Sequence, residues 1–415
     1  MKIATLSIGD ELVFGEVLDT NSSHIAAMLY DVGIKVQRHL LVGDNEPDIM
    51  ESIETLAERS EAVIVTGGLG PTADDLTARA AAKVTGRRLI LNDEALIHMR
   101  EFIGKGGGEF HAATERQALL PAKSTIIPNP TGTACGFIIT WNGHYLIFLP
   151  GVPSEMARML EDTVLPFLQE RLRQKVAIRT KVFTLFGISE AEIDQVIRDV
   201  PDSDNGLSVA FRVRFPTIDV KLRGEGDGEA AVMAILEKAA TVIRERLGDF
   251  IVAEDGATLD EEVARLFREK GLTVSLAESC TGGLIAKRLT DVAGSSAYFL
   301  QGAVVYSNAA KTRMLKVPET VINENGAVSA ETAKAMALGA KTVAGSDIAL
   351  AVTGVAGPGA TEEKPAGTVF IALADRKGCT VKGYHFRGDR RQVRNLTAFT
   401  ALDWLRRYLL SWQVR

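Results

Sequence analysis

The second half of the chain is organised by one stretch, in which an apolar run meets a glycine-rich helix start: Leu272-Thr273-Val274-Ser275-Leu276-Ala277-Glu278-Ser279-Cys280-Thr281-Gly282-Gly283. The apolar run predicts a buried strand, and a helix is expected to follow over Leu284–Leu289. Ser279 and Cys280 then lie at the strand end, where the N–H groups and dipole of a helix start can stabilise an oxyanion. The stretch predicts a nucleophilic site in an α/β domain. The residues alone do not separate Ser279 from Cys280, whose thiol is intrinsically the better nucleophile.

The base that would activate this nucleophile is not expected to be a histidine, because only one of the 6 histidines, His385, lies beyond residue 144. Lys311 is the better candidate. It follows the good N-cap residue Ser307, so it falls in or near a first helical turn, where the helix dipole disfavours a charged ammonium. Partial burial also disfavours the charged ammonium, so a neutral lysine base is predicted. Tyr306, expected at the strand end, could orient this lysine or relay a proton. The alternative is a solvated lysine on an ordinary helix.

A basic helix near the C-terminus offers a second binding element. Asp389 and Gln392 form a capping-box pattern, which predicts a helix that begins at Arg390 and ends near Leu410. Arg390 and Arg394 are four residues apart and share one face of this helix, so their guanidinium groups could clamp a phosphate. The alternative is an exposed basic helix without a ligand.

Length and composition limit the class of protein. A chain of 415 residues is too long for one ordinary core, and 46% hydrophobic with 24% charged residues is typical of a soluble globular protein. No apolar run reaches the ~20 residues of a membrane span. Three dispersed cysteines give no disulfide framework or zinc motif and favour the cytoplasm. The net charge of −6 argues against strong nucleic-acid binding.

Three domains are expected: residues 1–170, 171–253 and 254–415. In the first, strand-like and helix-like segments alternate, which predicts a largely parallel sheet covered by helices on both sides. Asn142-Gly143 between two apolar runs predicts a hairpin. The middle segment predicts a small α+β module, and the last segment a second α/β unit. The predicted fold class is therefore α/β, with two three-layer α/β/α domains joined by a small α+β module.

Four polar segments of the first domain are expected at the carboxyl ends of strands, where open α/β sheets bind ligands: Gly9-Asp10-Glu11, Val42-Gly43-Asp44, Thr66–Asp75 and Asn129–Thr133. Glycines in the third segment would let the backbone approach a phosphate, and Asp74 and Asp75 could hold a hard divalent cation or act as a base. A tight turn followed by helix-capping acids is the alternative for one such loop alone. Four segments in one domain favour a site.

These segments, together with the loop Leu149–Pro153, resemble the CinA family, whose first domain is similar to molybdopterin-binding folds and whose members are known as metal-dependent ADP-ribose pyrophosphatases. The resemblance implies Asp44 and Asp75 as catalytic, a divalent Mg, Mn or Co ion on Asp75 and Asp74, and a homodimer. It implies substrate contacts from Asp10, Glu11, Thr66, Gly67, Gly68, Gly70, Thr72 and Asn129. Cys135 stands where the family often has proline.

The last domain resembles the CinA C-terminal domain, which is similar to nicotinamide mononucleotide deamidases that use no cofactor. The resemblance implies Ser279 as the nucleophile, with Lys311 and Tyr306 completing the catalytic set. It implies substrate contacts from Thr281, Gly282, Gly283, Thr353, Gly354, Arg390 and Arg394. The family often carries more glycines where this chain has residues 359–363.

The middle module resembles a KH-type module, but its loop Gly224-Glu225-Gly226-Asp227-Gly228 lacks the GxxG spacing of an RNA site, so a structural or dimer-forming role is expected. The resemblance thus predicts a two-activity hydrolase of pyridine-nucleotide salvage. One alternative is a nucleotide-binding regulatory or scaffold protein of competence or recombination, with one or both sites inactive. Another is a molybdopterin-handling protein, an interpretation that depends on fold alone.

Overall fold

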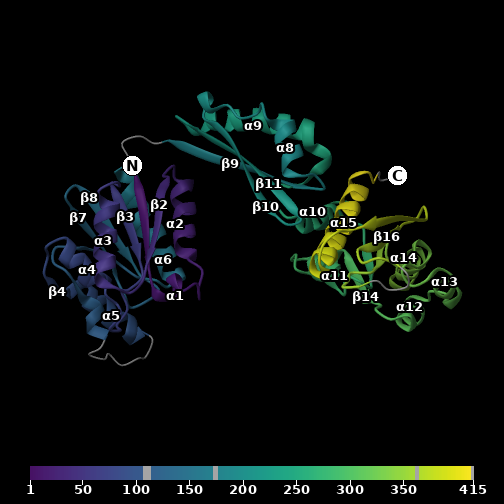
Figure 1. Ribbon diagram of the computed structural model, residues 1–415, viewed down its shortest axis with the longest axis horizontal. Coiled ribbons are helices and arrows are strands. Elements are labelled where there is room, and N and C mark those ends of the chain that lie inside the picture. Colours follow the sequence, from purple (N-terminus) through teal and green to yellow (C-terminus); the bar gives the residue numbers. More distant parts are fainter. Residues whose placement is uncertain (106–113, 172–175, 360–363, 413–415) are drawn as a thin grey trace. The chain divides into compact units, whose positions relative to one another are not determined.

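The computed structural model describes residues 1–105, 114–171, 176–359 and 364–412 (Figure 1). The chain divides into two compact units, Met1–Arg179 with Gly224–Ile235, and Thr180–Arg223 with Leu236–Arg415. The domains are described one by one below.

The first domain is built on a six-stranded sheet with the strand order β2-β1-β3-β8-β7-β6. Its strands are β2 (Val36–Val42), β1 (Ile3–Ile8), β3 (Ala62–Thr66), β8 (His144–Leu149), β7 (Gly136–Trp141) and β6 (Thr125–Ile127). The first four strands pair in parallel. Strand β7 pairs antiparallel with β8 on one side and with β6 on the other. The predicted β7–β8 hairpin is confirmed, since Asn142 and Gly143 both adopt the positive φ that its tight turn needs.

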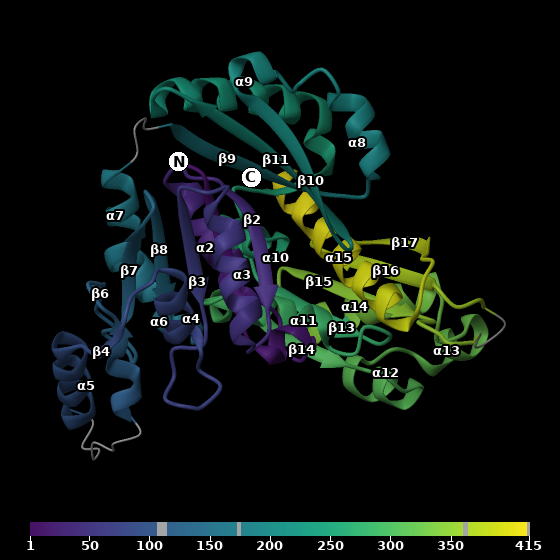
Figure 2. The ribbon, with the colours of Figure 1, turned by 60° about the vertical axis from the view of Figure 1, so that its left-hand side comes forward.

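Helices cover both faces of this sheet (Figure 2). One face packs on α2 (Thr20–Asp31), α6 (Pro153–Met159), the π-turn η2 (Leu160–Val164) and α7 (Leu165–Glu170), and the other on α3 (Glu46–Ala57), α4 (Thr77–Val84) and α5 (Asp93–Lys105). Short elements complete the domain: α1 (Asp10–Val13), η1 (Thr114–Ala118) and the two-stranded sheet of β4 (Leu89–Leu91) and β5 (Leu119–Pro121). Strand β3 is buried along its whole length, as a central parallel strand between two helical layers must be.

The middle module has a four-stranded sheet in the order β10-β11-β9-β12. Its strands are β9 (Ala177–Phe186), β10 (Leu207–Arg214), β11 (Thr217–Gly226) and β12 (Ile251–Glu254), and its elements also include α8 (Glu190–Ile197), η3 (Ser203–Asn205), α9 (Glu229–Leu247) and η4 (Gly248–Phe250). The α+β character predicted for this part of the chain is confirmed. The glycine-rich segment 224–228 completes β11 and leads into α9.

The third domain has a five-stranded sheet, β14-β13-β15-β16-β17, between two helical layers. The strands are β14 (Phe299–Val304), β13 (Val274–Glu278), β15 (Ile348–Gly354), β16 (Thr368–Ala374) and β17 (Cys379–His385). One layer contains α10 (Leu259–Lys270), α11 (Leu284–Thr290) and α15 (Arg390–Leu410), with η5 (Ser295–Ala297) leading into β14; the other contains α12 (Asn308–Leu315), α13 (Glu319–Asn325) and α14 (Ala330–Ala344). The predicted fold class is confirmed.

Local sequence explains where the helices of this domain begin. Ser307 caps α12 by accepting a hydrogen bond from the N–H of Ala310, and Asp389 with Gln392 forms the predicted capping box of α15. Tyr306 was expected at the end of a strand, but β14 ends two residues earlier, at Val304, so that Tyr306 lies in the connection to α12.

Helix α14 holds α12 in place through a close backbone contact. A Cβ added at Gly339 of α14 would lie 2.0 Å from the carbonyl oxygen of Leu315, the last residue of α12. The contact leaves no room for a side chain and sets the distance between the two helices.

We therefore expect Gly339→Ala to destabilise the domain by about 1–3 kcal/mol, although alanine is the better helix former, because α12 must move away. Gly104→Ala in α5 is the matched control: its Cβ would have no atom of a described residue within 4 Å, so a gain of up to about 1 kcal/mol is expected. Urea denaturation measures both changes. A stabilising Gly339→Ala would show that the two helices are not held by this contact.

Candidate functional site

The strand–turn–helix stretch brings a hydroxyl and an amine together in the third domain. Ser279 directly follows β13, and Lys311 reaches the same point from the first turns of α12. The Nζ atom of Lys311 lies 3.4 Å from Oγ of Ser279. Both side chains are buried, with exposed fractions of 2% for Lys311 and 8% for Ser279. This distance allows direct proton transfer between the two groups after a small adjustment.

The pair lines a cavity of about 360 Å³, a size suited to a small ligand. Its lining combines the serine–lysine pair with Cys280, Tyr306, Asn308, Ala327, Val328, Thr353, Arg390 and the backbone of residues 354–359. Residues 360–363, part of the loop in which this chain departs from the family, lie outside the described residues.

Tyr306 contacts Lys311 through its backbone rather than its phenol. Nζ of Lys311 lies 3.5 Å from the carbonyl oxygen of Tyr306, whereas the phenol oxygen accepts a hydrogen bond of 2.9 Å from Nη2 of Arg390. The side chain of Tyr306 is 60% exposed. The carbonyl therefore helps to orient the lysine, and the phenol lies at the mouth of the cavity.

Glu278, which the sequence analysis did not single out, occupies the start of α11. Its buried carboxylate accepts hydrogen bonds from the N–H groups of Gly283 (3.0 Å), Ile285 (3.1 Å) and Ala286 (2.7 Å). The expectation that these helix-start groups would stabilise an oxyanion is therefore wrong, because an internal anion already uses them.

Two other backbone donors, the N–H groups of Cys280 and Thr281, lie beside Ser279 and interact with the buried thiol of Cys280. Among the described residues, no oxygen accepts a hydrogen bond from the N–H of Cys280 or of Thr281. Both immediately follow Ser279 in the turn, so they are the candidate donors for an oxyanion formed there.

The two arginines of α15 do not form the expected phosphate clamp. Arg390 donates to the carbonyl oxygen of Gly357 and to the phenol of Tyr306, and it lines the cavity. Arg394 donates from Nε and Nη2 to the carbonyl oxygen of Thr281, at 3.2 and 2.6 Å, and is not part of the cavity lining. The guanidinium groups diverge because each is held by a different backbone carbonyl. Arg394 thus supports the turn that carries the nucleophile.

The other residues that were predicted to contact the substrate mainly support the protein's own backbone. Gly282 and Gly283 adopt positive φ in the turn, and the hydroxyl of Thr353 donates to the carbonyl oxygen of Ala327. Thr353 and Gly354 line the cavity, whereas Thr281, Gly282 and Gly283 do not. His385 lies at the end of β17, which two strands separate from β13, so it does not join the serine.

In the first domain, Asp75 holds the glycine-rich loop closed. Its carboxylate accepts hydrogen bonds from the N–H of Gly70 (2.7 Å) and from both the N–H and the hydroxyl of Thr72 (2.7 and 2.5 Å). Gly67 has φ +101, and a Cβ there would lie 2.2 Å from the carbonyl oxygen of Ile8. The loop is therefore a tight turn, and this geometry does not prevent it from also binding a ligand.

The loop nevertheless borders an acidic cavity of about 480 Å³ at the carboxyl ends of β1, β3 and β8. Of the predicted residues, its lining includes Glu11, Asp44, Gly67, Gly68, Gly70, Asp74 and Asp75. Asp10 lies behind it, exchanging backbone-to-carboxylate hydrogen bonds with Asp44 at 3.0 and 3.1 Å. Thr66 is buried at the end of β3, and Thr72 lines a neighbouring cavity.

Asn129 supports this cavity from within rather than lining it. Its fully buried amide donates to the carbonyl oxygen of Ala134 and to a carboxylate oxygen of Glu155, at 2.9 and 2.7 Å. Glu155, at the start of α6, does line the cavity, as does Gln117. The sequence analysis missed both, because neither belongs to a glycine-rich or acidic segment.

The acidic side chains could supply one or two ligands to a hard cation. Its other ligands would be water molecules or oxygen atoms of a bound substrate. Burial, together with the negative charges of Asp10, Glu11 and Asp74, raises the pKa of Asp44. A cation would relieve this repulsion. Among the residues described, however, no group of three or more Asp, Glu, His and Cys side chains forms a complete metal site. One or two carboxylates plus phosphate oxygens are the usual ligands of Mg²⁺.

Comparison with known proteins places the chain in a family. Three family models match consecutive parts of it: the probable molybdopterin binding domain at residues 4–170, the damage-inducible protein CinA KH domain at 180–253 and the CinA C-terminal domain at 256–409. A CinA-like protein of Geotalea uraniireducens is 60% identical over 412 residues, covering 99% of this chain and 98% of its own length. One from Geobacter metallireducens is 59% identical and covers 99% and 100%. The chain belongs to the CinA family.

A solved structure shares part of this likeness. The competence damage-inducible protein A (ComA) from Klebsiella pneumoniae is 38% identical, with a TM-score of 0.37, and the match covers 37% of this chain and 97% of that one.

Thiol chemistry separates Cys280 from Ser279. Burial, with the nearby charge of Glu278, raises the pKa of the Cys280 thiol to about 12, so about one thiol in 10⁴ is ionised at pH 8. We expect iodoacetamide at pH 8 to modify the half-buried Cys379 while Cys280 and the buried Cys135 react only after unfolding. Peptide mass spectrometry measures the labelling. Rapid modification of Cys280 in the folded protein would contradict this description of its environment.

Proposed function

We propose that the third domain is a nicotinamide mononucleotide deamidase, which releases ammonia and leaves nicotinate mononucleotide. The observation that supports this most directly is the 3.4 Å approach of the Lys311 amine to the Ser279 hydroxyl inside a ligand-sized cavity. The family membership favours the same serine–lysine chemistry, as does the position of His385, the one histidine beyond residue 144, at the end of a strand that two others separate from β13.

In the proposed reaction, Oγ of Ser279 attacks the carboxamide carbon while its proton passes to Nζ of Lys311. The negative charge that develops on the carboxamide oxygen is stabilised by the N–H groups of Cys280 and Thr281. Lys311 then gives the proton to the departing nitrogen, the C–N bond breaks and ammonia leaves. Water gives a proton to the same amine and attacks the carbonyl carbon of the resulting ester. The bond from this carbon to Oγ then breaks, Oγ takes the proton back from Lys311, and the carboxylate is released. Arg390, at the cavity wall, is the candidate partner for the substrate phosphate.

For this activity, we expect Ser279→Ala to reduce ammonia release by roughly 10³-fold or more, because the acyl-enzyme cannot form. Cys280→Ala should retain most of the activity, and Lys311→Met should be as deficient as Ser279→Ala. A coupled ammonia assay with nicotinamide mononucleotide measures the three variants, and thermal unfolding of the same preparations is the folding control. An active Ser279→Ala with an inactive Cys280→Ala would reverse the assignment of the nucleophile.

We also propose that the first domain hydrolyses ADP-ribose to AMP and ribose 5-phosphate. The acidic cavity at the strand ends supports this proposal, together with the glycine-rich loop, in which the N–H groups of Gly68 and Leu69 donate to no described acceptor. A divalent Mg, Mn or Co ion held by Asp75 and Asp74, as the family resemblance implies, would offset the diphosphate charge and stabilise the leaving oxygen. Asp44 would orient the attacking water, and Asp75 keeps the loop in the shape that presents its amides.

For the first domain, we expect Asp44→Asn to abolish AMP release and yet to raise thermal stability at pH 7. The pKa of Asp44 is raised in the folded state, so its contribution to stability is present below the unfolded-state pKa and is lost as pH rises through the folded-state value. The stability gain of Asp44→Asn should therefore shrink as pH falls towards about 4. Calorimetry at several pH values measures it. A variant less stable than the parent at pH 7 would contradict the proposed repulsion.

We also propose a homodimer, which the family resemblance implies, and a location in the cytoplasm, which the three dispersed cysteines favour. In the described part of the chain, no helix has the length and apolar character needed to cross a bilayer.

A further inference from the structure

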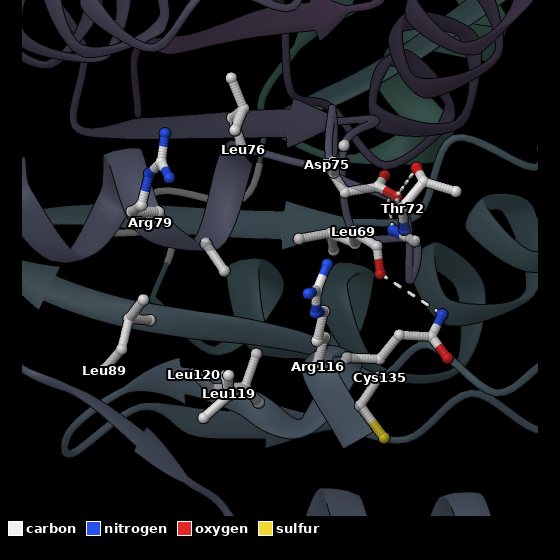
Figure 3. A pocket seen from close by; sticks show the side chains of 15 residues that line it. Leu69, Thr72, Asp75, Leu76, Arg79, Leu89, Arg116, Leu119, Leu120 and Cys135 are labelled. Carbon is white, nitrogen blue, oxygen red and sulfur yellow. Dashed lines mark hydrogen bonds between the residues drawn. The ribbon is translucent and has the colours of Figure 1, made fainter. Parts of the chain in front are cut away.

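A second cavity, of about 380 Å³, lies against the glycine-rich loop of the first domain (Figure 3). It shares five lining residues with the acidic cavity: Gly68, Leu69, Gly70, Asp75 and Gln117. The loop braced by Asp75 is therefore a wall common to both. A ligand lying across this loop would have one part in each cavity.

The walls of the second cavity differ in character from those of the first. Apart from the loop, leucines and alanines predominate, contributed by α4 and its start and by the β4–β5 sheet: Leu76, Ala78, Leu89, Leu119 and Leu120. Such a lining favours an apolar or aromatic group and offers little to a phosphate, which the acidic cavity and the loop amides would take.

Two polar side chains of η1 enter this apolar space. Figure 3 shows Arg116 pointing into the cavity, and its guanidinium forms no hydrogen bond or ion pair with any described residue. Arg79, at the opposite wall, is by contrast paired with Glu46 at 2.7 Å. Gln117 is buried and oriented: its amide oxygen accepts a hydrogen bond from Thr133 at 3.0 Å, and its Nε2 lies 3.5 Å from the carbonyl oxygen of Leu69.

Apolar walls, a guanidinium without a partner among the described residues and an oriented amide suit one class of group. A planar nitrogen heterocycle can lie against leucine side chains, stack on a guanidinium plane and accept or donate hydrogen bonds at its edge. A simple hydrocarbon would form no hydrogen bond with Arg116 or Gln117, and a sugar would gain little from contact with the leucine side chains.

We propose that this cavity binds the heteroaromatic base of a nucleotide whose phosphates lie on the other side of the glycine-rich loop, with Arg116 as the residue that contacts the base. The proposal rests on the nucleotide chemistry proposed above for the first domain and adds the position of the base.

Two variants test the position of the base independently of catalysis. Arg116→Ala removes an exposed side chain, and Ala78→Leu narrows the cavity without touching the acidic residues. Arg88→Ala is the matched control, because it removes an equally exposed arginine that does not line the cavity. Isothermal titration calorimetry with AMP, and with ribose 5-phosphate as the probe that lacks a base, is carried out on the full chain, and thermal unfolding confirms that each variant is folded.

We expect Arg116→Ala and Ala78→Leu each to weaken AMP binding about tenfold, while ribose 5-phosphate binding and the Arg88→Ala variant stay at the parent values. Unchanged AMP binding in both variants would overturn the proposal, as would an equal loss for ribose 5-phosphate, which would place Arg116 at the phosphates. A parent protein that binds neither probe would also overturn it.

Hydrolysis assays separate this proposal from the proposed activity. If the parent cleaves ADP-ribose and the two variants keep its kcat/KM, the activity stands and the position of the base is wrong. If AMP binding depends on Arg116 and Ala78 but no ADP-ribose is cleaved, the base site stands and the pyrophosphatase assignment fails.

Discussion

The turn that carries Ser279 in the third domain depends on one buried carboxylate. The carboxylate of Glu278 accepts three backbone hydrogen bonds at the start of α11, which satisfies donors that would otherwise be buried without partners. A buried carboxylate without such donors would be costly, so the acid and the helix start stabilise each other. Because Glu278 immediately precedes Ser279, this interaction also sets the direction in which the nucleophile leaves the strand. Arg394 completes the support by binding the carbonyl of Thr281.

Much of this arrangement could be predicted from the sequence, because it follows from local rules. An apolar strand followed by a glycine-rich helix start predicts where Ser279 lies, and an N-cap serine predicts that Lys311 is near a helix start. The use of each backbone N–H could not be predicted in this way. The pattern shows that donors exist, but only the fold shows that Glu278 turns back onto them. The prediction that Arg390 and Arg394 clamp a phosphate was wrong for a related reason. Their spacing predicts that they share a helix face, but the hydrogen-bond partners of each guanidinium determine where it points.

In the first domain, the sequence indicated the loops of the acidic cavity but not their internal contacts. Glycines and aspartates at strand ends are equally typical of a ligand loop and of a tight turn. The loop at Gly67–Asp75 is a tight turn that also lines the acidic cavity. Glu155 and Gln117 could not be predicted, since they reach the cavity from α6 and η1 through tertiary packing. Asn129 was predicted to contact a ligand because of its place in a polar segment, and the structure instead shows its amide binding the adjacent backbone and Glu155.

The two members of the serine–lysine pair are anchored in opposite layers of the third domain. Helix α11, which follows Ser279, packs in the core on one side of the sheet, whereas α12, which carries Lys311, packs with α14 on the other. The short distance between Nζ and Oγ consequently measures how the two layers are aligned across the sheet. If the proposed proton transfer takes place, a small shift of one layer along the sheet would lengthen this distance and lower the activity, even where it leaves every helix and strand intact.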